Sequence, residues 1–121
     1  MTHRDVFVVS TARTAIGTFG GSLKDVPNTQ LATTAVKAAI QRAGIAPDAV
    51  GHVVMGNVIP TDTKDAYLAR VAAIDAGCPI ETPAFNVNRL CGSGLQAIIS
   101  AAQAIGYGDC DVAVGGGSES M

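Results

Sequence analysis

The sequence has few charged side chains. Only 15% of its 121 residues are Asp, Glu, Lys or Arg, whereas soluble domains contain about 25%. A domain of this size has a large surface for its volume and should need more charge, not less. The shortage predicts that much of the surface is covered by something other than solvent.

Features of nucleic-acid-binding, membrane and secreted proteins are also missing. The formal net charge is −2, and the Lys and Arg residues are scattered, which argues against a nucleic-acid surface or a polybasic membrane contact. No apolar run reaches the roughly 20 residues that span a bilayer, and polar residues interrupt the nearest one, at 90–108. The N-terminus shows neither a signal peptide nor a transit segment. We therefore expect no membrane and no nucleic-acid partner.

Cysteine and histidine are scarce. Cys78, Cys91 and Cys110 cannot all pair, and they lack the spacing of metal ligands. We therefore expect no metal and a reducing, cytoplasmic location. Cys78 and Cys110 lack an activating helix start and are expected to be inert. Of the two histidines, His3 is expected in solvent, and His52 favours a structural role because it begins a predicted strand.

Short β-branched runs alternate with helical spacing along the chain. This order predicts a mainly parallel sheet with helices on its faces, an α/β fold. The pattern shows no internal repeat and no interdomain linker. Strands are predicted at 6–10 (buried), 53–58, 84–88 and 111–114, and helices at 31–43, at 65–76 and between Cys91 and Gly106.

The helix after Cys91 carries no charge, since no Asp, Glu, Lys or Arg lies between Arg89 and Asp109. One face of this helix carries apolar side chains, at Leu95, Ile98, Ile99, Ala102 and Ile105. The opposite face carries small, uncharged side chains, at Ala97, Ser100, Ala101 and Ala104. A helix at the surface would carry a polar, charged face. We therefore expect this helix to be buried on nearly every side.

Cys91 is the candidate nucleophile. It follows a predicted parallel strand, where open sheets place reactive groups. It also precedes a helix, whose free N–H groups and dipole favour an anion and hence the thiolate. Gly92 and Gly94 weaken the helix start by about 0.5–1 kcal/mol each relative to alanine, a cost tolerated where a ligand comes close. The alternative is a cysteine that serves only as a small hydrophobic residue.

Four segments of the chain resemble the thiolases, the family of acetyl-CoA acetyltransferases and 3-ketoacyl-CoA thiolases. In the family's order, these are 13–21 (RTAIGTFGG), 55–58 (MGNV), 87–97 (VNRLCGSGLQA) and 115–121 (GGGSESM). The resemblance implies a thiolase-like αβαβα sandwich, of which residues 1–121 form part of the N-terminal domain. The nucleophile helix would then pack against its counterpart in a C-terminal half absent from this chain. That half carries the family's catalytic His, a second Cys and an Asn.

The resemblance also implies a function. Cys91 would be acylated by an acyl-CoA, and its backbone N–H would be a possible oxyanion donor. Claisen condensation to a 3-ketoacyl-CoA, or the reverse thiolysis, would follow. The expected partners are acyl-CoA, coenzyme A, the missing half or a companion chain, and further copies in a homodimer or homotetramer. No bound cofactor is expected, and no residue is assigned to bind coenzyme A.

Several alternatives stay open. The chain resembles the related ketoacyl synthases less well. A non-catalytic subunit and a redox-active thiol are the other two alternatives. Arg89 either supports a thiolate or forms an ion pair or interface contact. Residues 115–117 match no nucleotide-binding motif; the resemblance makes them a tight turn beside the site.

Overall fold

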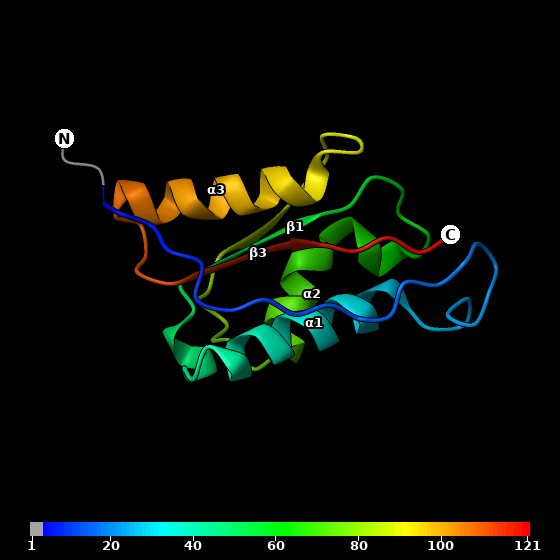
Figure 1. The fold of residues 1–121 in the computed structure, drawn as a ribbon, viewed down its shortest axis with the longest axis horizontal. Helices are drawn as coiled ribbons and strands as arrows, with labels where there is room; N and C mark the ends of the chain where they lie inside the picture. Colours follow the sequence, from blue (N-terminus) through cyan, green and yellow to red (C-terminus); the bar gives the residue numbers. More distant parts are fainter. Residues whose placement is uncertain (1–3) are drawn as a thin grey trace.

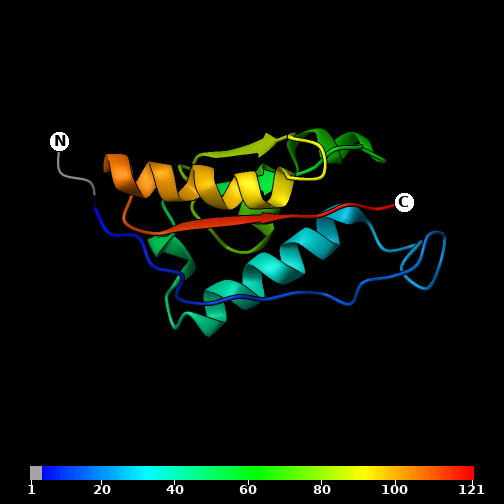
Figure 2. The same cartoon turned by 45° about the horizontal axis from the view of Figure 1, so that its top comes forward.

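The computed structural model describes residues 4–121, which form three layers (Figure 1). A parallel three-stranded sheet lies in the middle, with the strand order β2-β1-β3. Two helices cover one of its faces and α3 covers the other (Figure 2). The elements are α1 (Asn28–Arg42), η1 (Pro47–Ala49), β1 (His52–Gly56), η2 (Thr63–Tyr67), α2 (Leu68–Asp75), β2 (Ala84–Val87), α3 (Ser93–Tyr107) and β3 (Ala113–Gly117). The predicted α/β class is confirmed, while His3 lies outside the described residues.

The larger core lies between the sheet and the helices α1 and α2. The predicted apolar face of α1 enters this core, and so do alternate residues of β1, because successive strand side chains point to opposite faces. The contributors from these two elements are Ala32, Val36, Ile40, Val53 and Met55, all at most 2% exposed. Val54, between the last two, faces α3 instead.

The predicted helix at 65–76 is two elements. The 3-10 turn η2 comes first and α2 follows it directly. Tyr67, the last residue of η2, has a non-helical backbone conformation that separates the two. Asn86 of β2 bridges the break, since its side chain accepts from the N–H of Ala69 and donates to the carbonyl of Asp65, both at 2.8 Å. A strand side chain thus stabilises the irregular start of α2.

Small residues of α3 pack against the sheet. Ser93, Ala97 and Ala101 are buried on this face. A β-carbon at Gly115 would lie 2.7 Å from the Cα of Ile98, and one at Gly56 would lie 2.6 Å from the carbonyl carbon of Ser93. Because both contacts are with helix backbone, only glycine at these strand positions allows α3 to lie so close.

The predicted turn at residues 115–117 is wrong. These glycines belong to β3 and pair with 54–56 of β1. The turn was implied by the resemblance alone. Glycine usually weakens a strand, but here it makes room for a helix.

Within residues 4–121, α3 is buried only on the side that faces the sheet. The predicted burial on nearly every side also involved the C-terminal half that the resemblance implies. Leu95, Ile98 and Ile99 are 66%, 46% and 40% exposed. The sheet contacts the small-residue side of the helix, and within residues 4–121 these three side chains stay partly uncovered.

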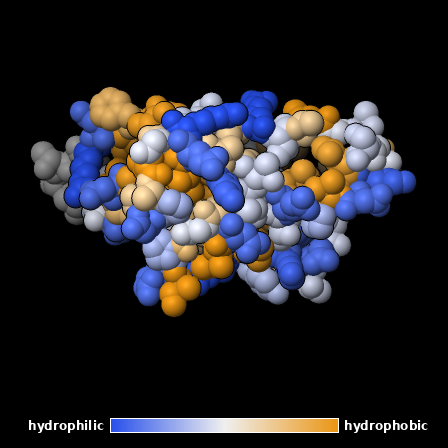
Figure 3. Space-filling view, turned by 90° about the horizontal axis from the view of Figure 1, so that it is seen from below, coloured by the Kyte–Doolittle hydropathy of each residue, from blue (hydrophilic) through white to orange (hydrophobic). Residues whose placement is uncertain are grey.

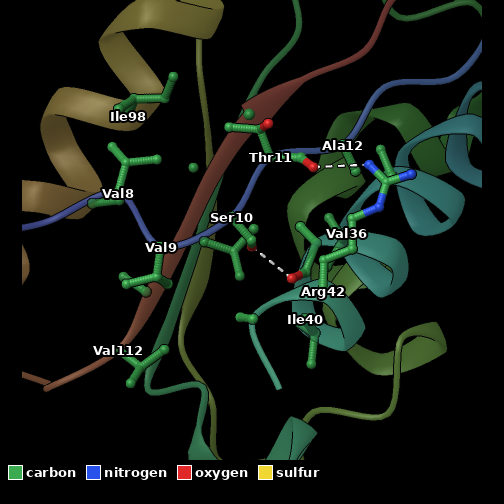
Figure 4. A pocket seen from close by; sticks show the side chains of 18 of the residues that line it. Val8, Val9, Ser10, Thr11, Ala12, Val36, Ile40, Arg42, Ile98 and Val112 are labelled. Carbon is green, nitrogen blue, oxygen red and sulfur yellow. Dashed lines mark hydrogen bonds between the residues drawn. The ribbon is translucent and has the colours of Figure 1, made fainter. Parts of the chain in front are cut away.

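Residues 6–10 are extended but are not the predicted buried strand. A strand needs a neighbour to accept and donate its backbone hydrogen bonds, and none in 4–121 pairs with this run. Instead, the Ser10 hydroxyl donates to the Ala39 carbonyl at 2.7 Å, and Arg42 donates to the Thr11 carbonyl at 2.9 Å (Figure 4). The run is therefore attached to α1 while its apolar side chains stay exposed, with Val8 at 77%.

No helix in the described part of the chain is long and apolar enough to cross a membrane.

Candidate active site

Cys91 lies at the carboxyl edge of the sheet, in the turn between the end of β2 at Val87 and the start of α3 at Ser93. Its side chain is exposed. Gly92 is the N-cap of α3, so Cys91 precedes the cap by one residue. Open parallel sheets bind ligands just beyond this edge, and the first turn of a helix presents free N–H groups there. An accessible thiol in this position suits attack on a bound electrophile.

The turn has a strained backbone that hydrogen bonds hold in place. Leu90 has a φ of 50°, a left-handed conformation that costs a residue with a side chain about 1–2 kcal/mol. The Leu90 N–H donates to the side chain of Asn88 at 3.0 Å, and the Gly92 N–H donates to the Arg89 carbonyl at 3.1 Å. Ser93, which is 5% exposed, makes two further bonds from its hydroxyl to this turn. The conformation just before Cys91 is therefore determined by several contacts.

Arg89 is held along the outside of α3. Its guanidinium donates to the Gln96 side chain at 2.6 Å, and Gln96 in turn donates to the hydroxyl of Ser100 at 3.2 Å. Within residues 4–121 Arg89 forms no ion pair. The ion-pair alternative is thus not found there.

A polar cluster at the same edge of the sheet escaped the sequence analysis. The Glu119 carboxylate accepts from the backbone N–H groups of Val58 and Ile59, the latter at 3.3 Å, and from the Asn57 side chain at 3.2 Å. Asn57 and Asn28 both donate to the Ser118 carbonyl, at 3.0 and 3.2 Å. These contacts join the loop after β1 to the segment after β3. The sequence does contain a signal for this cluster, because polar residues directly follow two of the predicted parallel strands.

This cluster lies next to the first turn of α3. A β-carbon at Gly117, the last residue of β3, would lie 3.3 Å from the Cα of Gly94. Asn57 is 5% exposed and its Oδ1 has no hydrogen-bond partner. Buried polar atoms are normally paired, so this oxygen is able to accept a hydrogen bond from a group that binds beside the site.

The structure does not bring His52 to Cys91. His52 begins β1, whereas the site lies beyond the strand's other end at Gly56, roughly 13 Å away at 3.3 Å per residue. Its ring packs against Phe85 with the centroids 5.5 Å apart. The structural role predicted for His52 agrees with this position.

The other two cysteines differ from Cys91. Burial raises the pKa of the Cys78 thiol, and burial together with the carboxylates of Asp109 and Asp111 raises the pKa of Cys110 despite the opposing Arg4. A raised pKa lowers the fraction of thiolate at neutral pH. Both observations fit the expectation that these two thiols are inert.

We therefore expect iodoacetamide at pH 7 to alkylate Cys91 before Cys78 and Cys110. The thiolate is the reacting form, and only Cys91 is exposed. Raising the pH toward 9 should increase alkylation of Cys78 and Cys110, because more of each thiol then ionises. Peptide mapping by mass spectrometry measures the order, and equal labelling of all three at pH 7 would contradict it.

No group of three or more His, Cys, Asp or Glu side chains within 4–121 is arranged to hold a metal ion.

Comparison with known proteins identifies the family. Residues 6–121 match the family model for the N-terminal domain of thiolase. The chain belongs to the thiolase family. The thiolase-like fold class and the resemblance of the four segments are thereby confirmed.

Named relatives cover the whole chain but are much longer. The beta-ketothiolase BktB of Cupriavidus necator is 63% identical over 118 residues, which are 98% of this chain and 30% of that protein. The mitochondrial 3-ketoacyl-CoA thiolase of Homo sapiens is 45% identical over 118 residues, again 98% of this chain and 30% of that protein. This chain thus spans about 30% of the length of these relatives.

Solved thiolase structures contain the same arrangement of elements. The acetyl-CoA acetyltransferase of Bacillus anthracis superposes with a TM-score of 0.85 at 41% identity, covering 91% of this chain and 28% of that one. The human mitochondrial 3-ketoacyl-CoA thiolase in complex with CoA has a TM-score of 0.83 at 43% identity, covering 86% and 26%.

Proposed function

We propose that the protein containing this chain is an acyl-CoA C-acyltransferase and that Cys91 is its nucleophile. The observation that carries the proposal is the exposed Cys91 thiol, presented by a braced turn between β2 and α3. The relatives of this chain are named as a beta-ketothiolase, an acetyl-CoA acetyltransferase and 3-ketoacyl-CoA thiolases, which supports the proposal. Coenzyme A thioesters are the proposed substrates, consistent with the human relative solved with CoA.

The first proposed step forms an acyl-enzyme. The thiolate sulfur of Cys91 attacks the carbonyl carbon of an acyl-CoA, and the carbonyl oxygen takes the negative charge. When the carbonyl re-forms, the carbon–sulfur bond to coenzyme A breaks, and coenzyme A leaves as a thiolate that takes up a proton. Attacking and leaving sulfurs are similarly stable, so neither direction is strongly uphill.

The second proposed step makes or breaks a carbon–carbon bond. In synthesis, a second acyl-CoA loses an α-proton to a base, and its α-carbon attacks the acyl-cysteine, which releases the Cys91 thiolate and a 3-ketoacyl-CoA. In thiolysis these steps run in reverse. The α-proton needs a positioned base, and His52 is at the wrong end of β1 to serve.

We further propose that the rest of the protein supplies this base and a second oxyanion donor. The Cys91 N–H would be one donor for the tetrahedral intermediate. The missing residues would be a C-terminal half of the same chain or a companion chain, in keeping with the 30% of the relatives that this chain spans. Assembly as a homodimer or homotetramer is part of the same proposal.

An open apolar surface supports a covering half. An open cavity of about 990 Å³ is lined by the 6–13 segment together with α1, α3 and β3. Phe7, Val8 and Val9 beside it are 77%, 77% and 72% exposed, and hydrophobic side chains gather on this face near the N-terminal end (Figure 3). Apolar side chains of α3 are exposed as well, among them Leu95, Ile98 and Ile99, and large exposed apolar patches mark sites of interaction.

The polypeptide 1–121 alone is expected not to turn over. On this proposal it carries the nucleophile, whereas the base and the second oxyanion donor belong to the remaining half. Incubation with acetyl-CoA, with released coenzyme A followed by a thiol reagent, should show no steady release, whereas the protein extended by its remaining half should show it. Steady turnover by the isolated polypeptide would contradict the proposal.

A further inference from the structure

The buried hydroxyl of Ser93 makes two hydrogen bonds to the turn that presents Cys91. It accepts from the Arg89 N–H at 2.8 Å and donates to the Leu90 carbonyl at 2.6 Å. The Ser93 N–H donates to the same carbonyl at 3.0 Å. The Leu90 carbonyl therefore receives two hydrogen bonds from one residue, and it belongs to the residue with the strained backbone.

These contacts bear on Cys91 through a shared peptide group. The carbonyl of Leu90 and the N–H of Cys91 belong to the same planar unit, so fixing one fixes the direction of the other. In the described chain, the hydrogen bonds that brace this turn use the N–H groups of Arg89, Leu90, Gly92 and Ser93 and not that of Cys91. The Cys91 N–H is thus held in a fixed direction while it takes no part in these hydrogen bonds.

Hydrogen bonds to a peptide carbonyl also polarise the peptide. Charge drawn toward the oxygen of Leu90 makes the N–H at the other end of the unit a stronger donor. An oxyanion hole depends on donors that are aligned before the reaction begins. Ser93 supplies both conditions for the Cys91 N–H.

We propose that Ser93 is a positioning residue that orients and polarises the Leu90–Cys91 peptide, so that the Cys91 N–H stabilises the oxyanion formed when Cys91 is acylated. This role rests on the proposed acyl transfer. Ser93 touches no reacting atom and acts only through the peptide of its neighbour.

The test compares two reactions of the same sulfur in the full-length protein that contains this chain. Acylation by acetyl-CoA passes through an oxyanion, whereas alkylation by iodoacetamide is a direct displacement and forms none. Ser93→Ala should lower kcat and the rate of acylation about 10- to 100-fold, less than the loss of a whole oxyanion donor. KM for acetyl-CoA and the alkylation rate of Cys91 should stay within about threefold of wild type.

Two further variants serve as controls. Ser93→Thr keeps the hydroxyl and should restore acylation. Ser100→Ala removes another hydroxyl from α3, one that accepts only from Gln96, and should leave both rates unchanged. If Ser93→Ala does not fold, Ser93→Cys replaces it, because its weaker thiol donor should slow acylation and not alkylation.

Wild-type acylation in Ser93→Ala, or in a folded Ser93→Cys, would overturn the proposal. So would an equal loss of acylation and alkylation, which would show that Ser93 only supports the turn. Failure of the wild-type protein to acquire an acyl group at Cys91 would contradict the acyl-transfer function itself, and this role of Ser93 with it.

Discussion

Cys91→Ala is expected to abolish acyl transfer in the full-length protein, with a loss in kcat of at least about 10⁴-fold. The sulfur is the atom that carries the acyl group between the two half-reactions, and no other side chain described at this edge of the sheet is a free thiol. Residual binding of acyl-CoA should persist, because the backbone of the turn stays in place. Steady-state thiolysis and synthesis assays measure the loss.

Cys91→Ser and Cys110→Ala test whether that loss is specific. A serine hydroxyl needs a strong base to become a nucleophile, so Cys91→Ser should be nearly as inactive as the alanine variant. Cys110 is partly buried and its pKa is raised by burial and by its acidic neighbours, so Cys110→Ala should keep wild-type activity. Activity of Cys91→Ala within tenfold of wild type would contradict its role as nucleophile.

Gly56→Ala is expected to destabilise the fold and displace α3. The added β-carbon would lie 2.6 Å from the carbonyl carbon of Ser93 and 2.8 Å from the nitrogen of Gly94. Both are backbone atoms at the start of the helix, so the helix itself must shift. Overpacking of this kind costs about 1–3 kcal/mol, and because the displaced turn carries Cys91, acylation should fall together with the free energy of unfolding.

Gly106→Ala, which changes a glycine of α3 itself, is the matched control. A β-carbon at Gly106 meets nothing within 4 Å, and alanine favours helix by about 0.5–1 kcal/mol over glycine. This variant should be as stable as wild type or more stable. Chemical denaturation measures both, and a Gly56→Ala protein as stable as wild type would show that α3 does not depend on the close approach.

The parts of the fold set by short-range patterns could be predicted. The apolar spacing in α1 identified its buried face, and β1 and β2 were located to within a few residues from short segments between helical patterns. Cys91 was found for the same reason, because its strand, its turn and its helix are contiguous in the chain.

The errors arose where the outcome depends on distant partners. The face of α3 that meets the sheet could not be read from the helix alone, because glycines of β1 and β3 select its small face. Residues 6–10 have the composition of a buried strand, yet no neighbour within 4–121 pairs with them. The cluster of Asn57 and Glu119 forms only because β1 and β3 are adjacent, although 62 residues separate the two side chains.

The position of the acyl group after a single turnover decides whether Cys91 is the nucleophile. The full-length protein is mixed with labelled acetyl-CoA, quenched in acid and digested, and the peptides are mapped by mass spectrometry. We expect one acetyl group on the peptide that contains Cys91, and its loss on addition of coenzyme A. Label on Cys78, on Cys110 or on no residue of this chain, while acyl exchange proceeds, would contradict it.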